Sequence, residues 1–441
     1  MGAALCRCLT TGAFGSYPPP AAASKSIASP PSKKPSPSRL LAPSTAAPST
    51  SVDGSEADCR LDEPDESYPK TDAAERAEAV QAVIFAAAAK EAEKPTDSLA
   101  LNLDPKWEKN GGKAIEAVLA STGLIDAQYL INLARYGGAL PRCEQVPAVA
   151  WIGPKQAWRL KSWSGFGSSP VLAISAGWLD PDHPDKRGAT LRKVLPVLQA
   201  LVATARTFAS HEHATIGVMW DVCCVPQLPP STSAEQEVAE RSRQDHARCL
   251  AHSAVHVLLV TTEPPRGGYR DRRRFEERGW SFVEERLSCL LKFDDCLWDL
   301  TKLEGAVGAT PSYASMLKLA RRRAPPMSPR DLEKELRQRK LYFRDTEDGA
   351  RAVRLYSLIF SESFDQFFSS FPARKKMLLC YKGRGFNDAD AATLAEALSY
   401  AAYNCKLPSG LVVHALTGNR FSPDAVELLK EKLKKTSLKI K

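Results

Sequence analysis

An alternation of short apolar runs with longer helical segments constrains the fold of this chain more than any other feature of its sequence. Each of three strand-length runs precedes a segment of helical length, at 171–175 and 191–204, 215–220 and 234–252, and 255–261 and 280–291. Short apolar runs bounded by turn residues are typical of buried strands. Their alternation with helices predicts an α/β domain with a parallel sheet and helices on both faces. A ligand site in such a sheet lies at the carboxyl ends of the strands.

The length of the chain indicates its number of domains, and the distribution of its charge bears on its partners. The chain has 441 residues and a formal net charge of +9, and this length predicts about two or three domains. The positive charge gathers at the two ends, because residues 1–52 hold five basic residues and no acid, and residues 430–441 hold six lysines against Glu431. A nucleic-acid reader carries its charge on a folded face, so we expect no nucleic-acid partner. No apolar run approaches the roughly 18 residues of a transmembrane helix.

The first 70 residues are predicted to form a disordered tail and an acidic linker, because residues 1–52 are mostly Pro, Ser, Ala and Thr and cannot bury enough apolar surface to fold. Three interpretations of the tail stay open: a plain disordered segment, an organelle transit peptide, or a membrane anchor acylated at Gly2, Cys6 and Cys8. The eleven cysteines include no CxxC pair, which indicates reduced thiols. We therefore expect a cytoplasmic protein, held at a membrane surface if the tail is acylated, or an organellar one if it is a transit peptide.

Four segments are expected after the tail. They are a helical segment at 71–165, the α/β domain at 166–305, a second helical segment at 306–372, and β/α units at 373–441. The first helical segment is predicted to contain helices at about 72–93 and 112–136, and the second a helical pair at about 329–343 and 347–360. Five phenylalanines are expected to pack as core or as a domain contact: Phe360, Phe364, Phe367, Phe368 and Phe371.

The last segment contains an internal repeat. Gly383, Phe386, Leu394 and Leu398 recur 35 residues later as Gly418, Phe421, Leu429 and Leu433. Each copy predicts a strand, a turn that contains glycine, and a helix. The run at 411–419 resembles a leucine-rich repeat, with Asn419 in the turn position. Because two such units cannot bury a core alone, we expect them to dock on the preceding helices.

Polar and aromatic side chains follow the three predicted strands of the α/β domain. Ser175, Trp178 and Asp180 leave the first strand, and Asp221 leaves the second. The third strand is followed by Tyr269, Arg278, Trp280 and Glu284. Since the carboxyl ends of parallel strands lie at one edge of a sheet, we expect these side chains to meet there.

These elements, in this order, resemble the Toll/interleukin-1 receptor (TIR) domain and the related heterokaryon-incompatibility (HET) domain over roughly residues 168–300. The spacing of Ser175 and Asp180 is similar to the start of TIR domains. The segment from Asp221 to Gln227 resembles the Asp-x-x-Cys-Ile-x-Gln segment of HET domains. Trp280 to Glu284 is similar to the TIR Trp-Cys-x-x-Glu motif, with Ser281 in place of the cysteine. The resemblance implies a flavodoxin-like parallel sheet.

The resemblance also implies an activity. In enzymatic TIR domains, the glutamate at the position of Glu284 supports cleavage of the bond between nicotinamide and ribose in NAD. The resemblance therefore implies that NAD is a substrate of this protein, and we expect no cofactor. Breaking that bond builds positive charge on the ribose, which a nearby carboxylate stabilises. Residues four apart share a helix face, so Trp280 would shield Glu284 from water. The arginines at 270–278 would meet a pyrophosphate, on a loop that Gly267 and Gly268 let move.

Other functions stay open beside this one. The same domain and the leucine-rich-like end would serve equally as a non-catalytic scaffold that binds protein partners or itself, with Glu284 exposed. A transferase or hydrolase acting on a nucleotide-like substrate in the same cleft is a third possibility. Glu285 is an alternative carboxylate, and Asp221 an alternative helix or turn cap. A zinc site of His246, Cys249, His252 and His256 is disfavoured, because His256 begins a predicted strand and leaves the shared helical face.

Overall fold

The computed structural model describes residues 106–161, 168–209, 212–265, 267–303, 312–369, 378–408 and 410–441. The predicted helix at 72–93 and the candidate lipidation sites Gly2, Cys6 and Cys8 lie outside these residues. Within the described part of the chain, no helix is long and apolar enough to cross a membrane.

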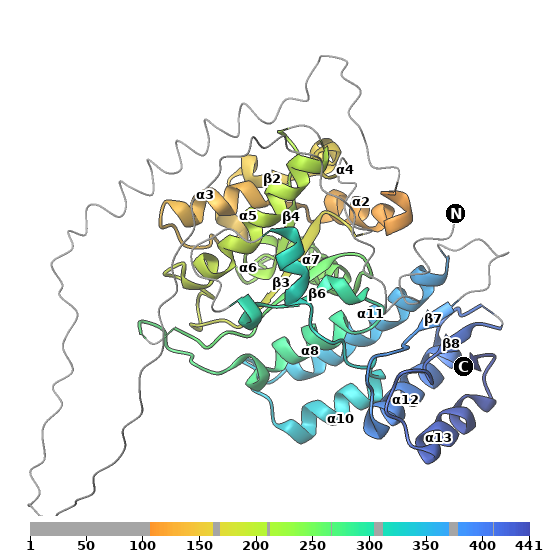
Figure 1. Ribbon diagram of the computed structural model, residues 1–441. Helices are drawn as coiled ribbons and strands as arrows, with labels where there is room; N and C mark the ends of the chain where they lie inside the picture. Colours follow the sequence, from red (N-terminus) through yellow and green to blue (C-terminus); the bar gives the residue numbers. More distant parts are fainter. Residues whose placement is uncertain are drawn as a thin grey trace, which may run out of the picture.

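A mixed sheet lies among the helices of the α/β domain (Figure 1). It has six strands in the order β2-β1-β4-β3-β5-β6. Four neighbouring strands are parallel: β4 (Gly217–Trp220), β3 (Val171–Ala176), β5 (His256–Val260) and β6 (Leu297–Asp299). Ile174 at the centre of β3 pairs with Trp220 on one side and Leu258 on the other. These strands are mostly apolar because helices bury both faces. The predicted α/β fold is confirmed, but the sheet is mixed and only mostly parallel, where a parallel sheet was predicted.

Two short antiparallel strands extend the sheet beyond β4. They are β1 (Leu124–Asp126), which pairs with β4, and β2 (Trp151–Ile152), which pairs with β1. The prediction of one continuous helix over 112–136 was therefore wrong. Helix α2 (Gly112–Ser121) ends before Gly123, whose φ of 82° places it in the left-handed region that glycine adopts most easily. The Asp126 carboxylate then accepts a hydrogen bond from the Gln128 amide and begins α3 (Ala127–Arg135).

The crossover connections assign the helices to the two faces of the sheet. The chain moves from β3 to β4 through α5 (Ala189–Ala209), and then in the opposite direction past β3 to β5 through α7 (Ser233–Ala251). Since parallel crossovers are right-handed, α5 and α7 lie on opposite faces. Helix α8 (Gly279–Ser288), between β5 and β6, lies on the α7 face, and α3 packs on α5. The α7 face is also covered by α11 (Asp348–Ser369), which contacts both α7 and α8.

The helices after the sheet follow the predicted pattern. Helix α10 (Pro329–Arg339) begins at Ser328, whose hydroxyl accepts a hydrogen bond from the Asp331 amide, and it packs on α11. On α11, Phe360, Phe364 and Phe368 are buried, which confirms their predicted place in the core, whereas Phe371 lies outside the described residues. Three α-helices in the described part of the chain have only one turn: α4 (Trp158–Lys161), α6 (Asp221–Cys224) and α9 (Tyr313–Met316).

The C-terminal segment forms a small three-stranded parallel sheet with two helices. Its elements are β7 (Leu378–Cys380), α12 (Asp388–Asn404), β8 (Val412–His414), α13 (Pro423–Lys434) and β9 (Lys439–Ile440). The Asn419 side chain joins the two repeats, because it donates to the carbonyls of Tyr381 and Ala415 and accepts from the Phe386 amide. Phe360 of α11 meets Tyr400 of α12 edge to face, with ring centroids 5.4 Å apart. The predicted β/α units and their docking on the preceding helices are confirmed.

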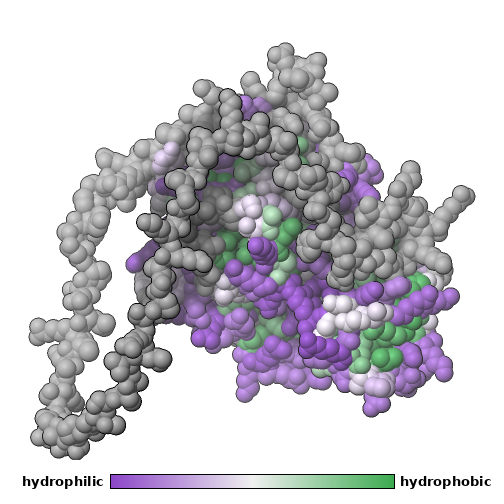
Figure 2. Space-filling view, in the orientation of Figure 1, coloured by the Kyte–Doolittle hydropathy of each residue, from purple (hydrophilic) through white to green (hydrophobic). Residues whose placement is uncertain are grey.

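The face of the molecule seen in Figure 2 is largely hydrophilic, with apolar side chains gathered in small patches, one of them over the region of the C-terminal helices. Two large apolar side chains in this region are exposed, Tyr403 on α12 by 65% and Leu428 on α13 by 36%.

Candidate active site

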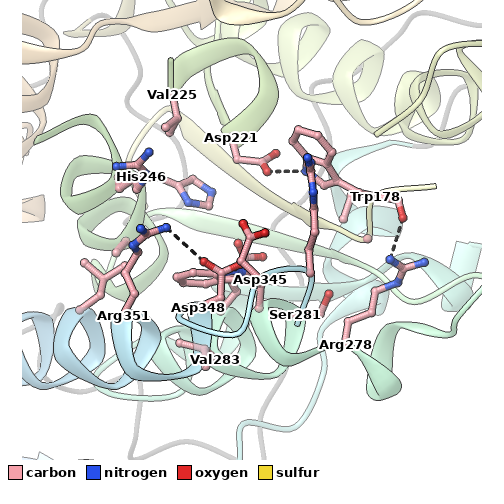
Figure 3. Close-up of a pocket in the computed structure, with 18 of the residues that line it drawn as sticks. Trp178, Asp221, Val225, His246, Arg278, Ser281, Val283, Asp345, Asp348 and Arg351 are labelled. Carbon is pink, nitrogen blue, oxygen red and sulfur yellow. Dashed lines mark hydrogen bonds and ion pairs between the residues drawn. The ribbon is translucent and has the colours of Figure 1, made fainter. Parts of the chain in front are cut away.

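A cavity of about 300 Å³ opens at the carboxyl ends of β3 and β4. The loop after β3, the start of α6, one face of α7 and one face of α8 line it, and the segment from Tyr342 to Leu355 closes its remaining side. Figure 3 shows residues of this cavity: Asp221 approaches from the strand ends, and Asp345 and Asp348 from the opposite side. The cavity therefore lies where a parallel sheet places its ligand site.

In this site, Glu284 on helix α8 is hydrogen-bonded to strand β3. The fully buried Ser175 near the end of β3 donates its hydroxyl hydrogen bond to Glu284 Oε2 over 2.5 Å. The pairing follows from the fold, because α8 packs across β3 with the Glu284 face toward the sheet. Glu285, on the next position of the helix, pairs instead with Arg321 at 2.8 Å and does not line the cavity. The structure thus separates the two carboxylates that the sequence left as alternatives.

The surroundings of Glu284 disfavour its charged form. Burial raises the pKa of Glu284 to about 8, the negative charge of Asp221 adds to this shift, and the hydrogen bond from Ser175 opposes it. A carboxyl group with a pKa this high is mostly protonated at neutral pH. Titratable groups perturbed in this way inside a cleft are common in active sites.

Asp221 is held by the loop that leaves β3. The indole Nε1 of Trp178 donates to Asp221 Oδ2 over 2.9 Å (Figure 3). Asp221 is the first residue of α6, and its carboxylate caps no amide in the described structure. The Gln227 side chain donates to the main-chain carbonyls of Asp221 and Val225 over 3.1 and 2.6 Å. Gln227 therefore fixes the turn that presents the Asp221 carboxylate to the cavity.

His246 reaches the same cavity from α7, and it was considered in the sequence only as a disfavoured zinc ligand. The side chain is 7% exposed and lines the cavity. Its ring is hydrogen-bonded to the Ile174 carbonyl, and Nε2 has no hydrogen-bond partner among the described residues. Burial lowers the pKa of His246, while the nearby charge of Asp221 opposes that shift. The free site therefore favours a neutral imidazole.

Most of the predicted site residues meet at the cavity. Those that line it are Trp178, Asp180, Asp221, Arg278, Trp280 and Glu284, with Ser175 one hydrogen bond behind. Tyr269 does not line it: its buried hydroxyl donates to Asp185 Oδ1 over 2.8 Å and fastens the loop to the start of α5. Asp180 Oδ1 also accepts from the Arg270 amide over 3.1 Å. Asp180 therefore anchors the loop that follows β5.

The Arg278 side chain is hydrogen-bonded to the loops around it. Its guanidinium donates to the Trp178 carbonyl over 2.6 Å and to Asp271 Oδ2 over 3.1 Å. Gly177 permits this approach, since a Cβ atom there would lie 2.5 Å from Arg278 Nε. Two more arginines of the loop are also paired, Arg273 with Asp271 and Arg274 with Glu263. The cationic side chains that line the cavity besides Arg278 come from other elements: Arg243, Arg344 and Arg351.

The segment that closes the cavity was missed in the sequence. Tyr342 exchanges backbone hydrogen bonds with Glu277 and Gly279, which attaches the segment to the start of α8. Asp348 then accepts a hydrogen bond from Trp280 Nε1 over 3.0 Å and pairs with Arg351 at 3.1 Å. These residues follow α8 by about 60 positions, and their sequence pattern predicts only a helix start.

A scan of this chain against models of protein families, a search among curated proteins and a search among solved structures each found no match.

The four residues of the disfavoured zinc site lie in different environments. His252 ends α7 and contacts the Gly111 carbonyl at 3.3 Å. His256 lies in β5, with its ring 4.4 Å from the Trp298 ring. Among the described residues, no group of three or more His, Cys, Asp or Glu side chains is arranged to hold a metal ion.

Proposed function

We propose that the α/β domain is a TIR/HET-like module that cleaves NAD at the bond between nicotinamide and ribose. The observation that carries this proposal is the hydrogen bond from Ser175 to Glu284, which brings the motif after the first parallel strand and the motif on α8 into one cavity. The catalytic interpretation requires Glu284 in a cleft with the strand-end residues, and the scaffold interpretation does not.

The topology supports the same proposal. If the four parallel strands are numbered along the chain, their order in the sheet is 2-1-3-4, as in flavodoxin-like sheets. Glu284 lies on the helix after the third of these strands, where the TIR resemblance implies it. The antiparallel strands β1 and β2 extend the edge of this core and leave the cavity side of β3 unchanged.

The chemistry of the cavity suits a cationic substrate. Loss of neutral nicotinamide leaves positive charge on the ribose, and fixed negative charge in a site shielded from water stabilises it. Glu284 and Asp221 supply carboxyl groups, and Trp178 and Trp280 supply indole rings. An opposite charge within about 4–6 Å lowers the pKa of a carboxyl group by roughly 1–3 units. The positive nicotinamide ring would therefore ionise Glu284 as it binds.

The remaining lining residues suit the nucleotide part of the substrate. Arg243, Arg344 and Arg351 are the cations that we assign to the pyrophosphate, because guanidinium groups match phosphate oxygens in pairs. Arg351 is already oriented by Asp348. We thus transfer to these three side chains the role that the sequence gave to the arginines of the loop at 270–278.

The test is nicotinamide release from NAD by the full chain at high protein concentration, since TIR-like enzymes act as assemblies. We expect release by the wild type and a loss on the order of 10²-fold or more in Glu284→Ala, as for removal of one charge-stabilising group. Glu285→Ala is the matched control, because Glu285 pairs with Arg321 outside the cavity. Absence of release from folded, assembled protein, or full activity in Glu284→Ala, would refute the proposal.

A second candidate function is favoured by the exposed Tyr403 and Leu428 on neighbouring helices of the C-terminal unit. Aromatic side chains are enriched at protein interfaces, so this unit is a candidate surface for self-association or for a protein partner. Tyr403→Ser would reduce assembly, as measured by light scattering, and an unchanged mass at all concentrations would contradict this role.

A further inference from the structure

His246 is the one imidazole that lines the cavity among the residues described by the structure, and nothing in the TIR/HET resemblance assigns it a role. It lies on α7, across the cavity from the Glu284 face of α8. It is more than nine-tenths buried, so its orientation is fixed by packing. Its hydrogen-bond partner is the Ile174 carbonyl in the middle of β3, one residue before Ser175.

The partners of the ring define its tautomer. A main-chain carbonyl accepts only, so the ring nitrogen that faces Ile174 carries the hydrogen. Nε2 is the nitrogen without a partner among the described residues, which leaves Nδ1 as the donor. Nε2 therefore carries a lone pair that no described group engages, on a side chain that lines the cavity. Leaving a buried polar atom without a partner is costly, so such an atom calls for an explanation, and a catalytic role is one.

We propose that His246 Nε2 is the general base that activates the water molecule in the hydrolysis of the ribosyl cation; this inference rests on the proposed function. As the C1′–N bond breaks, its electron pair leaves with nicotinamide. A water oxygen then forms the bond to C1′, and Nε2 accepts the proton that this water loses. The imidazolium later releases that proton to solvent. The products are ADP-ribose, nicotinamide and one proton, so the step balances without a further reactant.

Other basic groups of the cavity are less suited to this step. Glu284 faces the developing charge and is engaged by Ser175. Asp221 Oδ2 is engaged by Trp178, and its charge stabilises the imidazolium that forms when Nε2 takes the proton. Asp345 is exposed, so its carboxylate stays hydrated. His246 is buried and neutral in the free site, which is the state a base requires.

The closing experiment separates two reactions of the same full-length protein. Exchange of labelled free nicotinamide into NAD needs cleavage and re-formation of the C1′–N bond but no activation of water. Hydrolysis to ADP-ribose needs both. We expect His246→Gln to lower the hydrolysis rate by about 10²–10⁴-fold, the usual contribution of a general base, and to leave the exchange rate close to that of the wild type.

His252→Gln is the matched control, because it removes a second imidazole, the half-buried one at the C-cap of α7, which lines a different cavity. It should retain both reactions, and thermal unfolding of both variants reports on folding. If folded His246→Gln hydrolyses NAD normally, or loses exchange and hydrolysis equally, His246 is not the base, while the proposed function stands. If the wild type performs neither reaction, the proposed function fails first.

Discussion

Replacing Glu284 by Gln should stabilise the protein, and increasingly so as the pH rises. Burial and the charge of Asp221 raise the pKa of Glu284 from 4.5 to about 8. Folding therefore favours the protonated form, and the wild type loses stability as the pH rises from the unfolded pKa toward the folded one. Gln keeps an oxygen that accepts the hydrogen bond from Ser175 but carries no charge. The difference in unfolding free energy between variant and wild type should thus grow between pH 4.5 and 8 and then level off.

The size of the effect follows from the shift. One pKa unit corresponds to about 1.36 kcal/mol, so this shift amounts to at most about 5 kcal/mol. Glu284 keeps part of its surface open to the cavity, and we therefore expect about 3 kcal/mol. For a domain of about 150–250 residues, 1 kcal/mol changes the Tm by about 2–4 °C. The expected gain is several degrees at pH 8 relative to pH 5.

Thermal unfolding of both proteins at pH 5, 6, 7 and 8.5 provides the assay, because groups that titrate equally in both cancel in the difference. Glu285→Gln is the control: it loses the ion pair with Arg321 and gains no stability as the pH rises. A Glu284→Gln difference that stays constant from pH 5 to 8.5 would show that Glu284 is not desolvated in the folded protein, and the electrostatic argument for the site would fail.

Three further predictions follow from single contacts. Because the ionised form of Glu284 is the active one, kcat/KM for NAD cleavage by the wild type should rise about tenfold per pH unit and level off near pH 8; a flat profile in rate assays would contradict this. Asn419→Ala removes three hydrogen bonds, two of them to the first C-terminal repeat and one within its own, and should cost about 2–4 kcal/mol in denaturant unfolding. Asn404→Ala should cost much less, because the Asn404 side chain is exposed. Gly177→Ala should displace Arg278 and lower nicotinamide release, with native activity of the variant as the refuting result.

The sequence predicted those parts of the fold in which local pattern and burial agree. The runs that became β3, β4 and β5 are apolar because both faces of these strands are covered, so their strand character is visible without the structure. The two C-terminal repeats were equally visible, since Asn419 and the glycines of the turns recur at one spacing. In contrast, β1 is three residues long, too short to show a strand period of its own. Only its pairing with β4 makes it a strand.

The sequence likewise predicted only part of the candidate site, namely the residues that the strand ends bring together. Strand ends in a parallel sheet converge, so Ser175, Trp178, Asp221 and Glu284 were expected together and lie together. Tyr269 was misplaced because the loop after β5 turns its ring toward Asp185, a choice that no local pattern specifies. Asp345 and Asp348 reach the cavity only because Tyr342 pairs with the start of α8. Such contacts between distant segments carry no signal in one sequence.

The opposite shifts of two groups in one cavity bear on how the site would work. Burial favours the uncharged form of both, protonated Glu284 and neutral His246, while Asp221 perturbs each of them. Environments that push pKa values apart are how active sites assign acid and base roles. In the free protein the cavity keeps Glu284 uncharged, and the cationic substrate would ionise it on binding. The profile of kcat, which reports on the bound state, should therefore level off at a lower pH than that of kcat/KM. Coinciding profiles would mean that the substrate charge does not reach Glu284, and the carboxylate would then have no part in cleaving the bond.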